Sequence, residues 1–188
     1  MRGLSARRAA TVLRSNTEAF ERLGYRPLER DSSLSVVLAA PEGGRDLALR
    51  LTGEGRVFGG NWGLELSSLE PLLPRTRRGL TARGRGVVKM AGVKFRPRRG
   101  DDEAAPRIAA ALTDDAELGE ALGRVHFERI TVEPDGRPVI RHMGGSVVWT
   151  LLPPIIRATP LPPDQPRELV RAVDAFARAG ERLARETA

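Results

Sequence analysis

Two histidines and one glutamate are the side chains whose types and spacing could perform chemistry. The chain has 2 histidines, His126 and His142, and Glu128 lies close to the first of them. All three fall in a predicted β-hairpin closed by Pro134-Asp135-Gly136. Histidine titrates near neutral pH without perturbation, so two imidazoles and a carboxylate on one face could bind a metal ion or relay a proton.

The register of this hairpin decides whether the three side chains meet. If Glu133 pairs with Arg137, Glu128 lies opposite His142 and His126 lies diagonally next to it. A two-residue turn shifts the pairing by one residue and sends the histidines to opposite faces. The sequence leaves both registers open, and a structural, hydrogen-bonded role is the alternative to catalysis. His126, Glu128 and His142 are therefore the candidate catalytic residues, no metal site is assigned, and a non-enzymatic protein is favoured.

The main charge feature is a basic segment from Arg75 to Arg99, which has ten basic residues and no acidic one. Residues 100–120 follow it with 1 basic and 7 acidic residues, a net charge of −6. The overall charge of +7 is therefore concentrated in one place. Contacts from Lys and Arg to phosphates supply most of the sequence-independent affinity for nucleic acids, so the basic segment is a candidate polyanion site.

Residues 85–98 are predicted to form one long strand with a bulge at Gly92. The bulge would put Val93 and Phe95 on the core side and the cations on the opposite, wet side. The candidate anion-binding residues on that side are Arg85, Lys89, Lys94, Arg96 and Arg98. The alternative is a face that the adjacent acidic segment neutralises internally. Phe95 is the only aromatic residue in the segment, so no stacking platform for single strands is present.

Composition excludes several classes of protein. Hydrophobic residues make up 40% of the chain and charged residues 29%, which is typical of a globular protein and not of a disordered or polytopic membrane chain. The absence of cysteine excludes a disulfide scaffold and a thiolate metal site, and no cofactor is expected. Of the 31 basic residues 29 are Arg, which with abundant Ala, Gly and Pro is typical of GC-rich bacteria. The longest apolar run, residues 147–156, is too short to span a bilayer, so we expect a cytoplasmic protein.

Periodicity along the chain predicts an α+β fold. Helical spacing predicts helices at 4–23, 102–112, 114–122 and 166–184. Alternation predicts strands at 34–51 (a hairpin), 56–59, 62–66, 126–143 (a hairpin) and 147–152. The proline-rich residues 153–163 are expected to cross the surface as extended chain. We expect a single α+β domain over residues 1–188, with a mostly antiparallel sheet of about six to eight strands, N- and C-terminal helices and a helical insertion near residues 102–122.

The run ERITVEPDGRPVIRHMGGSVVWTLLPP and the closing helix, within residues 127–176, resemble a bacterial family described only as a domain of unknown function. The resemblance implies no activity and carries no catalytic residues.

The sequence favours a non-enzymatic binding or interaction domain that acts through its sheet surface, with a partner that is not identified. The partner could be a second copy of the chain, which would form a homodimer, or an anionic ligand. The strand at 147–152 with Trp149 and the apolar face of the C-terminal helix are the expected interface elements. Polyanion binding through residues 75–99 is the second hypothesis, and an enzyme or metal site at His126, Glu128 and His142 is the third.

Overall fold

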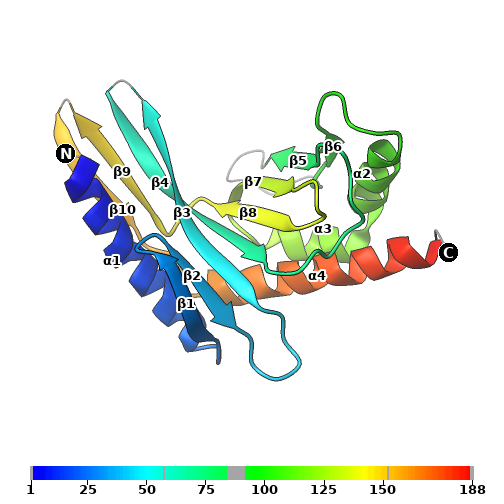
Figure 1. Cartoon of the computed structure of the whole chain (residues 1–188), viewed down its shortest axis with the longest axis horizontal. Coiled ribbons are helices and arrows are strands. Elements are labelled where there is room, and N and C mark those ends of the chain that lie inside the picture. The colour runs from blue at the N-terminus through cyan, green and yellow to red at the C-terminus, as the bar shows by residue number, and fades with distance from the viewer. Residues whose placement is uncertain (1, 57, 84–91, 152, 187–188) are drawn as a thin grey trace. The chain divides into compact units, whose positions relative to one another are not determined.

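The computed structural model describes residues 2–56, 58–83, 92–151 and 153–186 (Figure 1). Over these residues it has four helices and ten strands in a mostly antiparallel sheet. This confirms the α+β class, with more strands than the six to eight expected. Residue contacts divide the chain into two compact units, the first of Met1–Leu66 and Arg141–Arg167 and the second of Ser67–Ile140 and Glu168–Ala188. The single domain over residues 1–188 stays a prediction.

The first unit is built from one helix and six strands. The strand order is β1-β2-β3-β4, with β9 paired to β4 and β10 paired to β9. The chain leaves this unit through the end of β4 and returns to it at Arg141. Its elements are α1 (Arg2–Glu21), β1 (Arg26–Ser32), β2 (Ser35–Ala39), β3 (Leu47–Arg56), β4 (Gly59–Ser68), β9 (Ser146–Leu151) and β10 (Pro154–Thr159).

The core of the first unit forms where α1 lies against its strands (Figure 1). Leu47, Leu49 and Leu51 alternate along β3 and are buried, as are Leu13 and Phe20 of α1. Because successive side chains of a strand point to opposite faces, the even-numbered positions of β3 lie on the face away from this core.

The second unit has the strand order β8-β7-β5-β6 and most of the helical structure. Leu80, Ile130 and Val132 are buried on one side of these strands. The ring of Phe176 packs edge-to-face on Phe95, with the ring centroids 6.0 Å apart. Its elements are β5 (Leu80–Arg83), β6 (Arg96–Pro97), α2 (Ala104–Asp114), α3 (Ala116–Gly123), β7 (Phe127–Val132), β8 (Pro138–His142) and α4 (Gln165–Glu186), of which β8 and α4 each extend into the first unit.

Two strands of the first unit differ from expectation. β10 lies in the proline-rich stretch that was expected to be extended chain without a sheet partner. Pro154 is its first residue and β10 pairs only with β9, a position where a proline removes no ladder hydrogen bond. β1 has the sequence RPLERDS, which lacks alternation, and it pairs only with β2. Both segments form strands because they pair with a neighbouring strand, and not because their own sequences alternate.

Two further strands are corrected. In the described part of residues 85–98 only Arg96–Pro97 forms a strand, and Gly92 adopts a left-handed φ of 70°, which is not the backbone conformation of a strand. Residues 85–91 lie outside the described residues. The strand expected at 56–59 is wrong, because Arg56 ends β3 and Gly59 begins β4.

The turn between β7 and β8 follows one of the two registers that the sequence leaves open. The Glu133 amide donates to the Arg137 carbonyl oxygen at 2.9 Å, and the Gly136 amide donates to the Glu133 carbonyl oxygen at 2.9 Å. Gly136 has φ of 91°, which a residue with a side chain rarely adopts. These bonds confirm the pairing of Glu133 with Arg137.

Candidate functional site

A groove of about 680 Å³ lies in the first unit where the turn between β3 and β4 meets β9. We call it the β4–β9 groove. Most of its surface is apolar, and Phe58 at its edge is 67% exposed. The residues that line it are Glu54, Phe58, Gly59, Gly60, Asn61, Val148, Trp149 and Thr150.

Two glycines allow the strands to approach closely at this groove. Gly59 pairs with Thr150 and Gly60 pairs with Trp149. A Cβ atom on Gly59 would lie 2.5 Å from the carbonyl oxygen of Trp149, and one on Gly60 would lie 3.0 Å from the Trp149 ring. The missing side chains therefore leave backbone and an indole ring as walls of the groove, and any larger residue would push β9 away.

A buried arginine lies beside the groove. Arg141 is only 2% exposed, and its guanidinium lies over Gly63, where a Cβ atom would be 2.6 Å from Nη2. Its Nη1 lies 3.1 Å from Glu54 Oε1 and donates to Glu65 Oε1 at 3.2 Å. Further bonds run from Nη1 to Thr52 Oγ1 at 3.1 Å and from Nη2 to Asn61 Oδ1 at 3.2 Å.

This arrangement gives Arg141 a positioning role. A buried charge is tolerated when opposite charges and hydrogen-bond acceptors surround it, and Arg141 has four such partners on β3 and β4. Two of the four, Glu54 and Asn61, also line the groove. The Asn61 carbonyl oxygen accepts from Arg141, and this bond does not use the amide NH2 of Asn61.

His142 occupies a different polar site of the first unit and is 2% exposed. The Gly144 amide donates to its Nδ1 at 2.8 Å, and its Nε2 lies 3.0 Å from Oε1 of the buried Gln165. Since Nδ1 accepts from a backbone amide, Nε2 carries the proton and donates to Gln165. Both ring nitrogens are therefore engaged in hydrogen bonds that hold the turn before β9.

The other two candidate catalytic residues, His126 and Glu128, are exposed residues of the second unit. Within the part of the chain that the structure describes, no group of three or more His, Asp or Glu side chains is arranged to hold a metal ion. A joint task for His126, Glu128 and His142 stays a prediction, and the bonding of His142 favours the structural alternative.

Of the candidate anion-binding residues that the structure describes, two are exposed as the sequence predicts and one is half-buried. Val93 and Phe95 are buried, whereas Lys94 and Arg96 between and after them are exposed. Arg98 is half-buried, and its Nη2 lies 3.4 Å from Glu133 Oε1. Arg85 and Lys89 lie outside the described residues, so their part in an anion site stays a prediction.

The carboxylates of the acidic segment bind groups other than the side chains of Lys94 and Arg96. Asp101 Oδ1 accepts from the backbone amide of Arg78 at 2.8 Å, and Asp102 Oδ2 accepts from that of Arg77 at 2.9 Å. Asp115 and Glu117 pair with arginines of α4. Burial raises the pKa of the Asp115 carboxyl, but hydrogen bonds from the Leu118 amide and from Arg182 outweigh this and lower the pKa below its ordinary value. Among the described residues, these carboxylates therefore do not neutralise the side chains of Lys94 and Arg96.

Neither the groove nor the site of Arg141 is predicted from the sequence. The expected interface strand at 147–152 supplies Val148, Trp149 and Thr150 to the groove. The pair Gly59-Gly60 is a signal that could have indicated it, because glycine inside a strand often marks the close approach of another backbone. The acceptors around Arg141 carry no such signal, since they come from positions 76 to 89 residues away in the chain.

Comparison with known proteins places the chain in a family. Residues 19–179 match the family described as protein of unknown function (DUF3156), and the chain belongs to that family. This confirms the resemblance seen in residues 127–176 and extends it over most of the chain. No curated protein and no solved structure matches the chain. Over the described residues, none of the helices is both long and apolar enough to cross a bilayer.

Proposed function

We propose that this chain is a non-enzymatic binding protein that holds its ligand in the β4–β9 groove. The observation that carries the proposal is the groove itself, because its volume of about 680 Å³ falls in the range of small-molecule sites. Its lining is mainly apolar with a few polar side chains, the composition that such sites usually have. The strand that was expected to form an interface supplies one wall.

The chemistry of the lining favours an uncharged, largely apolar ligand with one hydrogen-bond acceptor. Phe58, Val148 and Trp149 offer apolar surface to its body. The Asn61 amide can donate to a carbonyl or ether oxygen, because its own carbonyl oxygen is bonded to Arg141. The carboxylate of Glu54 at the edge disfavours a ligand that carries an acid group.

Fluorescence titration with Nile red, an uncharged apolar dye that bears a carbonyl group, tests the proposal. We expect saturable binding with a rise and blue shift of the dye emission. Val148→Arg should weaken binding at least tenfold by placing a charge in the groove. Leu28→Arg is the matched control, because Leu28 is an exposed apolar residue of β1 outside the groove. Equal affinity of the two variants would refute a ligand site at the groove.

A second candidate function is polyanion binding by the basic segment. It is favoured by the exposure of Lys94 and Arg96 and by the other partners of the acidic segment. It needs no contribution from the β4–β9 groove, since the two sites belong to different units. The test is whether the intact chain binds any polyanion at low salt.

The proposal also retains the cytoplasmic location and the homodimer as predictions. Both rest on sequence alone: the absence of cysteine is compatible with a reducing compartment, and an exposed sheet surface is compatible with self-association. Analytical ultracentrifugation of the full chain measures the second of these directly.

A further inference from the structure

The two edge strands of the first unit differ in how open they are to further pairing. Among the described strands, β1 pairs only with β2 and β10 pairs only with β9. Register shifts interrupt the pairing of β1, and its sequence, RPLERDS, has four charged residues and a proline. Irregular pairing, charges and prolines are the usual protections of an edge strand, so β1 is a protected edge.

β10 has much less of this protection. It pairs with β9 through six consecutive residue pairs without a register shift. Its one proline, Pro154, is its first residue, and its one charged residue is Arg157. Five of its six residues are exposed, and Ile155 is 51% exposed. A regular and exposed edge of this kind is a site where an extended segment of another chain can add a strand.

The backbone groups that β10 turns outward follow from its pairing with β9. The Leu151 amide donates to the Phe58 carbonyl oxygen at 2.9 Å, so the backbone groups of Leu151 point away from β10. Leu151 pairs with Pro154, and this alternation turns the backbone groups of Pro154, Ile156 and Ala158 away from β9. Ile156 and Ala158 therefore each offer one N–H and one C=O to an added strand.

The side chains of β10 determine the chemistry of the segment that it can bind. Arg157 pairs with Val148, and Val148 pairs with Asn61, whose side chain lies on the sheet face away from α1. Ile155 shares that face with Arg157 and extends the apolar surface of Val148, which is 44% exposed. Arg157 is exposed and pairs with no carboxylate that the structure describes. An added segment that fits would set an apolar side chain beside Ile155 and an acidic one beside Arg157.

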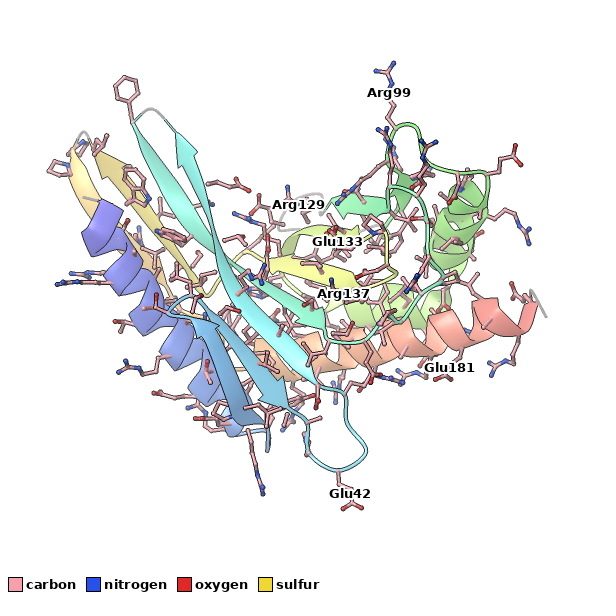
Figure 2. All side chains as sticks on the ribbon, viewed as in Figure 1. Glu42, Arg99, Arg129, Glu133, Arg137 and Glu181 are labelled. Atoms are coloured by element: carbon pink, nitrogen blue, oxygen red, sulfur yellow. The ribbon has the colours of Figure 1, made fainter. Side chains whose placement is uncertain are left out.

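The helix beside β10 adds positive charge. α1 contacts β9 and β10, and its N-terminal end lies beside β10 in Figure 1. Residues 2–17 of α1 include four arginines and no acidic residue, and Arg7 and Arg8 are exposed. Figure 2 shows side chains that end in nitrogen along the outer side of α1, whereas the labelled acid of this unit, Glu42, lies between β2 and β3. The surroundings of β10 are therefore basic and favour an acidic partner.

We propose that the outer edge of β10 binds an extended, acidic segment of another protein by strand addition. A second copy of this chain fits the edge less well, because β10 has no acidic residue. Pairing of two β10 strands would also set two Arg157 side chains on one face. The described lining of the β4–β9 groove includes no residue of β10, so this binding does not depend on a ligand in the groove.

The test is fluorescence anisotropy of the full chain with two peptides that differ only in charge, TVEVIVT and TVKVIVT. Both have blocked termini and carry an uncharged dye. At about 20 mM salt, where the Debye length is about 20 Å, we expect saturable binding of the glutamate peptide and binding about threefold or more weaker for the lysine peptide. Arg157→Glu should reverse this preference. The matched control is Arg26→Glu, at an exposed arginine of the protected edge β1, which should leave the preference unchanged.

Ala158→Pro tests the backbone contact separately from the charge. Proline removes the outward amide of Ala158 and leaves the pairing with β9 intact, so affinity for the glutamate peptide should fall by about tenfold or more. The matched control is Ala158→Thr, which keeps the amide and should bind as wild type does. Thermal melts verify that each variant folds. If Ala158→Pro does not fold, N-methylation of the peptide valines removes the same hydrogen bonds from the other side and should cause the same loss.

Each outcome bears on one part of the proposal. Equal affinity for the two peptides would overturn the acidic partner, and equal affinity of the Ala158→Pro and Ala158→Thr variants would overturn strand addition at β10. A dimer in analytical ultracentrifugation that Ala158→Pro abolishes would assign the edge to a second copy instead. No binding of either peptide at about 20 mM salt would overturn the proposal as a whole and leave Nile red binding in the groove unaffected.

Discussion

Arg141 in the first unit and Arg96 in the basic segment of the second unit show two opposite settings of the same side chain. Arg141 is buried and its guanidinium has partners in Thr52, Glu54, Asn61 and Glu65. Arg96 is exposed, and no ion pair with a described carboxylate restrains it. An arginine can be buried only where acceptors surround it, so the first is committed to structure and the second remains available to a ligand.

The variant of this comparison with the largest expected effect on stability is Arg141→Met. Removing one partner of a buried ion pair leaves the other charge uncompensated, so we expect a loss of about 3–5 kcal/mol in the free energy of unfolding. Urea denaturation measures it. Adding Glu65→Gln should recover part of the loss, because Glu65 is 19% exposed and is then no longer a buried, unpaired charge. A loss below about 1 kcal/mol would show that the acceptors are not needed.

A smaller effect is expected from Gly63→Ala. Its Cβ would lie 2.6 Å from Arg141 Nη2, so the guanidinium must shift away from its acceptors. We expect a loss of about 1–3 kcal/mol, as for overpacked cores. Gly55→Ala is the matched control, because a Cβ there meets no atom within 4 Å. Similar stabilities of the two variants in urea denaturation would show that the position of the Arg141 guanidinium does not depend on a glycine at residue 63.

Asp115 of the acidic segment should give an effect of intermediate size on stability. Asp115 caps α3 by accepting from the Leu118 amide at 3.0 Å, and Asp115→Ala should cost about 0.5–2 kcal/mol at pH 7. The folded state lowers the pKa of Asp115, so this stability is present above the ordinary carboxyl pKa and is lost as pH falls through the folded-state pKa. The difference between wild type and variant in urea denaturation should therefore shrink in acid. Asp114→Ala, at an exposed neighbouring carboxylate, is the control for the loss of stability at pH 7.

The smallest effect is expected from Arg96→Gln. An exposed arginine without a described ion pair contributes within about 0.5 kcal/mol to stability, so the unfolding midpoint in urea should not change measurably. If the second candidate function is right, the same variant should weaken polyanion binding at low salt. A large loss of stability would instead make Arg96 a structural residue and end the contrast with Arg141.

Local signals explain how much of the fold could be predicted. The helices and the turn at Pro134-Asp135-Gly136 follow from spacing and turn residues within a few positions, and they occur where expected. β1 and β10 could not be predicted, because their pairing partners and not their own sequences make them strands. Figure 1 shows β9 beside β4, and this pairing joins Gly59 to Thr150 across about half of the chain.

The candidate site could be predicted from the sequence only in part, for the same reason. Alternation places Lys94 and Arg96 on a wet face, but the register that adds Arg129 to that face appears only in the folded sheet. The histidines are candidates because of their side-chain chemistry. In the structure, however, His142 is hydrogen-bonded to Gly144 and Gln165, the second of them 23 residues away. Residue type identified these side chains, and only tertiary contacts could assign their roles.

The most direct test of the proposed function is an NMR titration of the 15N-labelled full chain with 2-heptanone, a small uncharged ketone. We expect saturable shifts of the Gly59 and Gly60 amides, the Asn61 side-chain amide and the Trp149 indole, with much weaker shifts from heptanoate because of Glu54. The resonances of Thr81 and Thr131, a strand pair of the second unit, should not move. Shifts that avoid the β4–β9 groove, or equal shifts from the ketone and the acid, would contradict it.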